Sequence, residues 1–251
     1  MNNILSGAVI SDSVILEDGV EIGHNSVILS GSQPDEISRI CHGAVIGSNC
    51  TIYKGVTIGQ RALIMPGSVV KQSIPPLAIV EGNPANITGY VETTKSQEYS
   101  AQELASSPAM VSTSVSAVKI YNLLNVLDLR GNLTVGEFDR HIPFSVKRFF
   151  LVYDVPTLET RGEHAHIECK QFLVAVKGSI HVIADDGVSR EEFTLDRPTM
   201  GLYLPPMTWG VQYRYSSDAV LLVFASDDYD ASDYIRNYDE FIEQCRKKNR
   251  V

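Results

Sequence analysis

The sequence predicts an all-β protein in which a parallel β-helix is followed by a jelly-roll barrel and a C-terminal helix. Over residues 4–70 a large aliphatic residue returns every six positions. After residue 115 the pattern changes to short alternating apolar and polar stretches separated by turn sequences. A polar stretch rich in Ser and Thr lies between them. We therefore expect domains at 1–91 and 116–251, joined by a linker at 92–115 that contains a helical turn at 101–105.

The N-terminal repeat has a period that fits neither a helix nor ordinary strand pairing. The series begins with Ile4, Ile10 and Leu16, and after one irregular stretch it resumes in phase from Ile40 to Val70. A triangular β-helix has this period, with one short strand and one corner for every six residues and three such units per coil. The aliphatic residues are expected to fill its interior.

The repeat ends in a proline bend, Ile74-Pro75-Pro76, and a Gly82-Asn83-Pro84-Ala85 segment. Residues 4–91 resemble the hexapeptide-repeat acyltransferases in this respect. The resemblance implies left-handed coils, a trimer, and acetyl-CoA or another acyl-CoA bound between subunits. Sugar N-acyltransferases of that family carry a long loop or additional coils between the early and the closing repeats, where this chain has only residues 29–39. The domain is therefore either an N-acyltransferase or an assembly module.

Two histidines of the repeat are candidates for the acyltransferase base. His24 and His42 each stand two residues after an interior aliphatic residue, and they are 18 residues apart. Since one coil is 18 residues long, we expect them to stack on one corner about 4.8 Å apart, with Gln60 next in the column. One of them could act as a general base, or the position could simply be an exposed corner that tolerates polar residues.

The sequence pattern of the C-terminal half predicts short strands and one helix. Strands are expected at 118–121, 146–153, 171–176, 179–184 and 220–225. A helix is expected from Ser232 to Lys248, with Ser232 or Asp233 as its N-cap and Ile235 in its apolar stripe.

A pair of histidines is the most informative motif of this half. His164 and His166 are two residues apart on a predicted strand, so both side chains face the barrel interior. The spacing resembles the first cupin motif, His-x-His-x4-Glu-x6-Gly, with Gln171 in place of the glutamate. The second cupin motif would supply another histidine, but residues 204–213 contain none. We therefore expect no metal, and two imidazoles suited to proton transfer.

Residues 116–245 resemble the sugar-nucleotide 3,4-ketoisomerases, a metal-free cupin family. The resemblance implies a dTDP-4-keto-6-deoxyhexose substrate, whose ketone moves from C4 to C3 without a cofactor. Some members of the family are fused to a hexapeptide-repeat acyltransferase. The matching segments run in order along the domain: 128–133, 141–144, 152–156, 161–166, 201–206 and 226–236.

Each candidate site residue has a role in this interpretation. His164 and His166 jointly move the protons, with Tyr153 as the nearest phenol, and the sequence does not assign the roles within the pair. Arg161 is chosen for an anionic group of the nucleotide because its planar fork matches phosphate oxygens, the alternative being an arginine paired within its turn. Gln171 is a substrate-binding candidate, and so are Trp209 and Tyr213, which line the cavity mouth or pack in the core.

The composition of the chain excludes some classes of binding partner. The formal charge of −9 argues against nucleic acid, and no apolar stretch is long enough to span a membrane. The four cysteines are widely spaced, which favours free thiols in the cytoplasm. The β-helix resembles trimeric proteins, and the cupin resembles proteins that dimerise by exchanging an N-terminal strand. A chain that makes both contacts is expected to form a homohexamer.

Two other functions stay open. The barrel could be a 3,5-epimerase-like cupin acting on the same substrates, although the His–Asp pair typical of that family is not evident in the sequence. Alternatively, the chain could be a nucleotide-sugar-binding or scaffold protein whose inward histidines only hold a ligand. The sequence does not decide the stereochemistry at C4, or whether the base is thymine or uracil.

Overall fold

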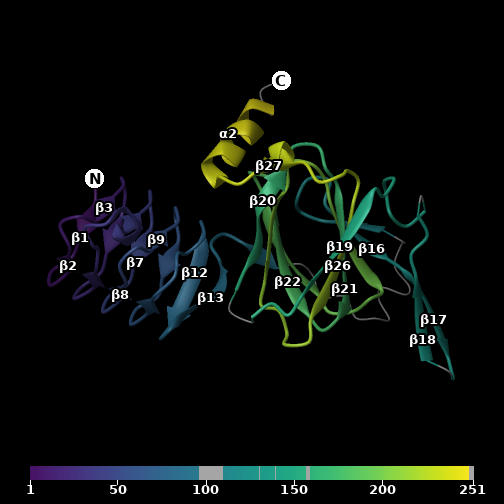
Figure 1. Cartoon of the computed structure of the whole chain (residues 1–251), viewed down its shortest axis with the longest axis horizontal. Helices are drawn as coiled ribbons and strands as arrows, with labels where there is room; N and C mark the ends of the chain where they lie inside the picture. Colours follow the sequence, from purple (N-terminus) through teal and green to yellow (C-terminus); the bar gives the residue numbers. More distant parts are fainter. Residues whose placement is uncertain (96–109, 130, 139, 157–158, 249–251) are drawn as a thin grey trace. The chain divides into compact units, whose positions relative to one another are not determined.

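The computed structural model describes residues 1–95, 110–129, 131–138, 140–156 and 159–248. The chain divides into two compact units, Met1–Thr93 and Thr94–Val251. Figure 1 shows the first as a stack of short parallel strands and the second as two facing sheets. Among the described residues, no helix has both the length and the apolar character needed to cross a membrane.

The first unit is a parallel β-helix with three faces, as the period of six predicts. One face is built from β1 (Asn3–Ile4), β4 (Glu21–Ile22), β7 (Val45–Ile46), β10 (Leu63–Ile64) and β12 (Ala78–Gly82), and β13 (Ala85–Tyr90) pairs antiparallel with β12. The second face is formed by β2 (Val9–Ile10), β5 (Val27–Ile28), β8 (Thr51–Ile52) and β11 (Val69–Val70), and the third by β3 (Ile15–Leu16), β6 (Arg39–Ile40) and β9 (Thr57–Ile58).

The core of this unit is a ladder of aliphatic side chains. From Ile22 to Ile64, the interior isoleucines are at most 1% exposed. Each fully buried isoleucine contributes on the order of 1.5–3 kcal/mol relative to an exposed one, so the repeated position stabilises every coil. Small residues, including Ala44 and Ala62, are also buried where the faces converge.

One coil is longer than the others. Ile4 pairs with Ile22 and Ile46 with Ile64, an offset of 18 residues, but Ile22 pairs with Ile46, an offset of 24. The extra residues are those of the irregular stretch, which forms a short 3-10 helix, η1 (Pro34–Glu36). A whole hexad is added, so the aliphatic series stays in phase. Each later strand, however, lies one face behind the position that an uninterrupted 18-residue coil would give it.

The second unit has two six-stranded sheets, consistent with the predicted barrel. The first sheet has the order β14 (Thr94–Lys95), β23 (Arg190–Leu195), β22 (Ile180–Asp185), β25 (Trp209–Tyr213), β20 (Arg161–His166) and β27 (Tyr234–Ile235). The second has the order β15 (Met110–Ser112), β16 (Lys119–Asn122), β24 (Met200–Leu204), β21 (Gln171–Lys177), β26 (Val220–Ala225) and β19 (Arg148–Tyr153). Buried side chains of both sheets, among them Leu173, Val182, Phe193 and Leu221, form one core.

A separate hairpin, β17 (Leu124–Asp128) and β18 (Gly131–Val135), extends away from these two sheets (Figure 1). The segment expected as a linker contributes strands at both of its ends, since β14 pairs with β23 and β15 with β16. The helical turn expected at 101–105 lies outside the described residues.

The C-terminal helix is shorter than predicted. α2 spans Tyr238–Lys248, and Asn237 caps it by accepting a hydrogen bond from the N–H of Glu240 at 3.0 Å. The predicted cap at Ser232 or Asp233 is wrong, because these residues lie around the 3-10 helix η2 (Ala231–Asp233). Ile235 was assigned to the helical stripe, but it pairs with Ala165 in β27.

Candidate functional site

A β-bulge in β20 places the two histidines. Gly162 pairs with Val211 and His164 with Gly210, so one additional residue, Glu163, is accommodated between them. Gly162 has φ +83°, and a Cβ there would lie 2.6 Å from the carbonyl oxygen of Gly210. Only glycine fits this position, and the bulge that it permits brings the side chains of His164 and His166 into one cavity.

His164 presents one free ring nitrogen. Its Nδ1 lies 2.8 Å from the carbonyl oxygen of Gly162, which can only accept, so Nδ1 carries the proton. In the described part of the chain nothing hydrogen-bonds to Nε2. Burial lowers the pKa of His164 to about 4, so the imidazole is neutral at pH 7 and its Nε2 holds an available lone pair.

His166 is held at both ring nitrogens. Its Nδ1 lies 2.7 Å from a carboxylate oxygen of Asp233, and its Nε2 lies 3.0 Å from the amide nitrogen of Gln171. An amide nitrogen only donates, so Nε2 accepts and Nδ1–H donates to Asp233. Burial lowers the pKa of His166, and the carboxylate of Asp233 opposes that effect.

The cavity around the histidines is mixed in polarity. Polar groups of Gln171, Thr208 and Gln212 face it, while one wall is apolar, and the full lining is His164, His166, Cys169, Gln171, Leu204, Pro205, Thr208, Gly210 and Gln212. No Lys, Arg or carboxylate is among these lining residues. This arrangement suits a neutral, hydroxylated ring more than a charged group.

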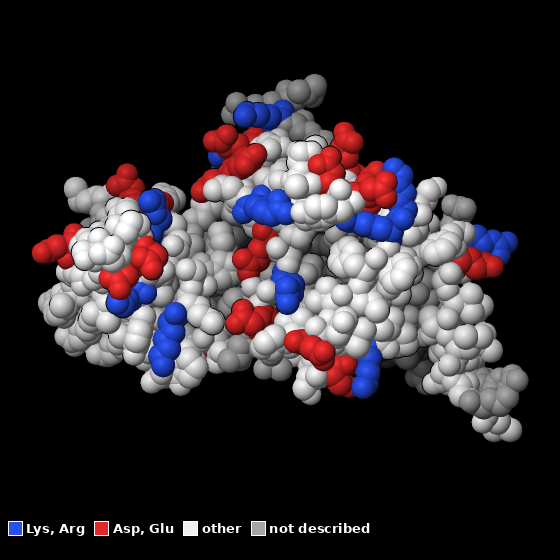
Figure 2. Space-filling view, in the orientation of Figure 1, with Lys and Arg blue, Asp and Glu red and all other residues white. Residues whose placement is uncertain are grey.

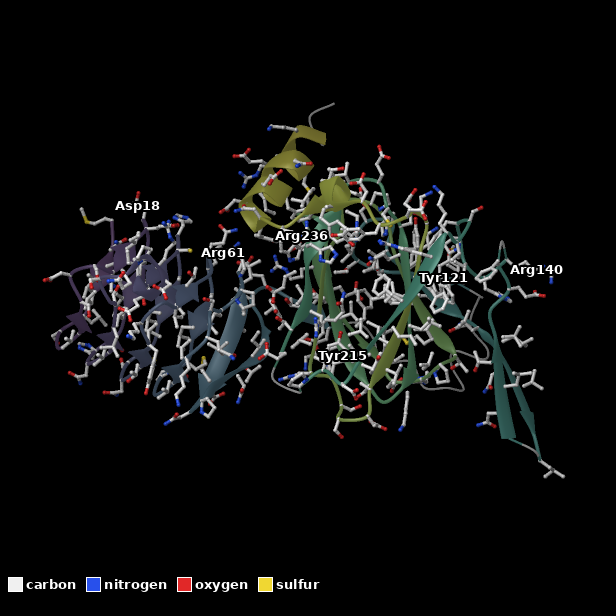
Figure 3. The ribbon with its side chains drawn as sticks, in the orientation of Figure 1. Asp18, Arg61, Tyr121, Arg140, Tyr215 and Arg236 are labelled. Atoms are coloured by element: carbon white, nitrogen blue, oxygen red, sulfur yellow. The ribbon has the colours of Figure 1, made fainter. Side chains whose placement is uncertain are left out.

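The C-terminal segment before α2 completes the site. Asp233 fixes His166, and the ring of Tyr234 packs against both imidazoles, with centroids 4.8 Å from His164 and 4.4 Å from His166. The guanidinium of Arg236 lies 4.3 Å from the centre of the Tyr234 ring. Figure 3 shows Arg236 at the end of the barrel where α2 begins. The sequence motif at 226–236 predicts no role for Asp233, Tyr234 or Arg236, so these site residues come from the structure alone.

The family model "FdtA: WxcM-like, C-terminal" matches residues 116–246, just over half of the chain. The chain belongs to this family. A second model, "Bacterial transferase hexapeptide (six repeats)", matches residues 38–72 within the β-helix.

Relatives of the WxcM-like unit are sugar isomerases. A TDP-4-oxo-6-deoxy-alpha-D-glucose-3,4-oxoisomerase of Aneurinibacillus thermoaerophilus is 45% identical over 131 residues, which cover 52% of this chain and 94% of that protein. A 3,4-ketoisomerase structure from Helicobacter canadensis is 38% identical with a TM-score of 0.50, covering 52% and 98% of the two chains. A sugar 3,4-ketoisomerase from Thermoanaerobacterium thermosaccharolyticum in complex with TDP is 34% identical with a TM-score of 0.52, covering 53% and 97%.

Two residues expected in the site of this WxcM-like unit lie elsewhere. Tyr153 is 59% exposed, and its neighbour Val152 packs against the core, so alternation along β19 directs the phenol to the opposite face. Arg161 is exposed at the far end of β20 from His166, near Tyr215, which Figure 3 shows well away from Arg236. The aromatic hydroxyl beside the histidines belongs to Tyr234 instead.

Trp209 and Tyr213 face away from the cavity. Gly210 and Gln212 of the same strand line it, so Trp209 and Tyr213 lie on the other face of β25. Trp209 packs against Phe241 of α2, and the hydroxyl of Tyr213 donates to Glu192. The core-packing alternative is therefore the right one for Trp209, because α2 covers this outer face.

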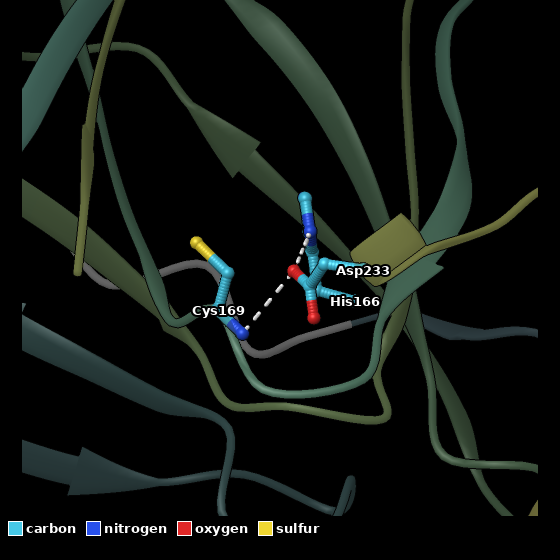
Figure 4. Close-up of side chains that lie close together, drawn as sticks. All are labelled: His166, Cys169 and Asp233. Atoms are coloured by element: carbon cyan, nitrogen blue, oxygen red, sulfur yellow. Dashed lines mark hydrogen bonds and ion pairs between the residues drawn. The ribbon is translucent and has the colours of Figure 1, made fainter. Parts of the chain in front are cut away.

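His166, Cys169 and Asp233 form a set of metal-type donors, the one such group in the part of the chain that the structure describes (Figure 4). Their donor atoms all lie within 4.8 Å of one another. Asp233 already accepts hydrogen bonds from His166 and from the backbone N–H of Glu168 at 2.7 Å, so it is satisfied without a cation. The expectation that the barrel works without a metal stays a prediction.

His24 and His42 do not stack. His24 follows β4, and its carbonyl accepts from the N–H of Asn49 in the next coil, whereas His42 follows β6 and its carbonyl accepts from the N–H of Arg61. The expected common corner is wrong because the 24-residue coil lies between them. Gln60 does continue the column of His42, as predicted.

Proposed function

We propose that the WxcM-like barrel is a 3,4-ketoisomerase of a TDP-4-keto-6-deoxyhexose and that it requires no cofactor. The observation that carries the proposal is the neutral His164 imidazole, whose Nε2 lone pair is unoccupied beside the cavity. A carbon acid next to a ketone needs such a base. The ketoisomerases that the barrel resembles supply the substrate class.

In the first step, Nε2 of His164 removes the proton from C3. The C–H electron pair forms a C3=C4 double bond, and negative charge develops on the C4 oxygen. Donors that face the cavity, including the hydroxyl of Thr208 and the amides of Gln171 and Gln212, are available to stabilise that charge. The site is buried, so each such hydrogen bond is stronger than it would be in water.

In the second step, the protonated His164, whose Nε2–H exchanges with solvent, delivers a proton to C4. The C3 hydroxyl loses its proton, the C4 oxygen gains one, and the net result is a 3-keto sugar with a hydroxyl at C4. We assign the movement of the oxygen protons to His166, whose tautomer Asp233 and Gln171 hold in place. One imidazole then works on carbon and the other on oxygen.

The 3,5-epimerase alternative gains support from the His166–Asp233 pair, which the sequence did not reveal. The 45% identity to an oxoisomerase over 131 residues outweighs that pair. Incubation with dTDP-4-keto-6-deoxyglucose, followed by NMR of the sugar, separates the candidates. A 3-keto product supports ketoisomerisation, a product inverted at C5 supports epimerisation, and unchanged sugar supports a binding protein.

For the β-helix we propose acetyl transfer to the amino group of a dTDP-3-amino-3,6-dideoxyhexose, with acetyl-CoA as donor. The support is the hexapeptide-repeat match alone. Because His24 and His42 stand on different corners, at most one of them lies beside a given acceptor. Release of free CoA from acetyl-CoA in the presence of the amino sugar measures the activity. His24→Ala and His42→Ala should then differ, and no CoA release by the unaltered chain would leave assembly as the role of this unit.

The hairpin β17–β18 supports association of two barrels. Leu124, Val126 and Leu133 on it are each at least 41% exposed, and a two-stranded hairpin with an uncovered apolar surface is marginal on its own in water. We propose that the hairpin packs on a second copy of the chain. Combined with a trimeric β-helix, this contact gives a hexamer. No disulfide joins the four cysteines, all of which the structure describes, in keeping with the cytoplasmic location that we propose.

A further inference from the structure

Cys169 lies where two pockets of the barrel meet. It lines the histidine cavity together with His166, and it also lines a second pocket of about 450 Å³. We call the second one the acidic pocket, because five of its lining residues carry carboxylates: Glu168, Asp227, Asp228, Asp230 and Asp233. A ligand in the acidic pocket therefore reaches Cys169 and Asp233, the partner of His166, without entering the histidine cavity.

The acidic pocket concentrates negative charge. The one cation among its lining residues is Lys147, whose Nζ lies 3.4 Å from Asp227 and offsets that carboxylate. On the face drawn in Figure 2, acidic and basic side chains are interspersed, so an excess of carboxylates in one pocket is a local feature. The field of the pocket attracts cations of every kind, and the available donor atoms decide which cation binds.

Three donor atoms of different kinds come together at this place (Figure 4). A ring nitrogen of His166, the sulfur of Cys169 and a carboxylate oxygen of Asp233 all lie within 4.8 Å of one another. Usual bond lengths to a four-coordinate Zn²⁺ put its donor atoms about 3.4–3.6 Å apart, so the set has to contract by roughly 1 Å. A thiolate combined with an imidazole suits Zn²⁺, whereas Mg²⁺ and Ca²⁺ prefer oxygen ligands.

We propose that Nδ1 of His166, Sγ of Cys169 and the carboxylate of Asp233 bind a Zn²⁺ ion, and that the bound ion inhibits the barrel. Nδ1 is the ring nitrogen on the side of Asp233, while Nε2 faces Gln171. Water from the acidic pocket completes the tetrahedron. The inhibition rests on the proposed function, in which His166 moves the protons of the sugar oxygens, but the binding of the ion does not.

Zinc binding changes the tautomer on which the proposed mechanism depends. Cys169 binds as a thiolate, so its thiol proton goes to solvent. The ion takes the Nδ1 lone pair of His166, and the ring proton moves to Nε2, which now accepts a hydrogen bond from the amide of Gln171 at 3.0 Å. Nε2–H can accept neither that bond nor a proton. His166 is thereby withdrawn from proton transfer, and one proton leaves the protein for each ion bound.

Calorimetric titration of the full-length, EDTA-treated protein with Zn²⁺ tests the site without substrate. Co²⁺ in place of Zn²⁺ should show the near-ultraviolet absorption of a cobalt–thiolate bond. Loss of a hydrogen-bond partner of a ligand already costs roughly 10–100-fold in metal affinity, so loss of the ligand itself in Cys169→Ser should cost about 100-fold or more. Cys41→Ser is the matched control, because Cys41 is a partly exposed cysteine of the β-helix, and it should bind Zn²⁺ like the unaltered protein.

Isomerisation rates test the inhibition, with each protein compared with its own rate in EDTA. Saturating free Zn²⁺ should slow the unaltered protein and Cys41→Ser on the order of 10²-fold, as for loss of a proton-transfer group. Excess EDTA should restore both rates. The same Zn²⁺ concentration should leave the rate of Cys169→Ser close to its value in EDTA, and Mg²⁺ should slow none of the three proteins.

Equal zinc affinity of Cys169→Ser and the unaltered protein overturns the proposal. Equal inhibition by Mg²⁺ and Zn²⁺ also overturns it, because the carboxylates alone would then hold the ion, and zinc that binds through Cys169 without slowing isomerisation overturns the inhibitory role. Circular dichroism checks folding, and Cys169→Ala serves if the serine variant is unfolded. If the unaltered protein does not isomerise the sugar but its zinc binding depends on Cys169, the proposed function fails and the metal site stands.

Discussion

The carboxylate of Asp233 accepts a hydrogen bond from Nδ1 of His166 at 2.7 Å, although 67 residues separate the two in the chain. The contact joins the C-terminal segment to the histidine strand and fixes the tautomer of one imidazole. The other imidazole, His164, uses a local backbone carbonyl for the same purpose. The two histidines thus have the same tautomer but different environments. The proposed roles, His164 acting on carbon and His166 on oxygen, follow from that difference.

The first prediction concerns the base. His164→Asn removes the lone pair that takes the C3 proton, so we expect turnover to fall on the order of 10²–10⁴-fold, as is typical for loss of a general base. His181→Asn is the matched control, because His181 belongs to β22 of the same sheet and bonds to Glu192 outside the cavity lining. Initial rates with the keto sugar provide the measurement. Similar rates in the two variants would refute the assignment.

The second prediction concerns Asp233 as a positioning residue. Asp233→Asn replaces a carboxylate that accepts from His166, Glu168 and Cys169 with an amide that has only one acceptor oxygen. We expect kcat to drop roughly 10–100-fold, in the range for loss of an orienting partner, with KM nearly unchanged. Loss of Asp233 also removes a charge that raises the pKa of both His164 and His166, so the acid limb of the kcat profile should move to lower pH. A fall in stability with an unshifted profile would indicate a merely structural role.

The third prediction is the pH dependence of the free enzyme. Burial lowers the pKa of His164 to about 4, so its imidazole is neutral and active above that pH and is inactivated by protonation as the pH falls through it. We expect kcat/KM to be level from pH 8 down to about 5 and to decline below that. A decline centred near 6.5, the value of an unperturbed histidine, would show that the base is solvated and is not the buried His164.

Much of the architecture could be predicted because it depends on local periodicity. The period of six identified the β-helix and its buried isoleucines, and alternation identified strands such as β21 and β26. The corner positions of His24 and His42 could not be predicted. They depend on which coil of the β-helix contains the six additional residues. A hexad insertion leaves the period intact, so the irregular stretch in the sequence does not by itself show that the later strands change face.

Only some of the site residues could be predicted from the sequence, because the others reach the site through strand pairing between distant segments. The two histidines share a short motif, but Asp233 and Tyr234 reach them from the C-terminal segment through pairing of β20 with β27. The pattern of residues 232–245 fitted a helix, which concealed that pairing. The sequence leaves Trp209 either at the cavity mouth or in the core. The structure decides for packing, because the outer face of β25 is covered by α2 and the inner face has Gly210 and Gln212.

The fourth prediction concerns assembly. A contact between two β17–β18 hairpins, together with threefold packing of the β-helix, predicts six subunits by light scattering of the intact chain. Replacing Leu124 and Leu133 with serine removes exposed apolar surface from the hairpin and should convert the hexamer to trimers without unfolding the barrel. A monodisperse monomer of the unaltered protein would contradict both contacts.

The proposed reaction of the barrel moves a carbon-bound proton between C3 and C4 of a keto sugar. The most direct measurement is NMR of dTDP-4-keto-6-deoxyglucose incubated with the protein in deuterated water. We predict deuterium at C3 of the recovered substrate and at C4 of a new 3-keto product, with none at C5. Exchange at C5, or complete absence of exchange and product, would contradict the account.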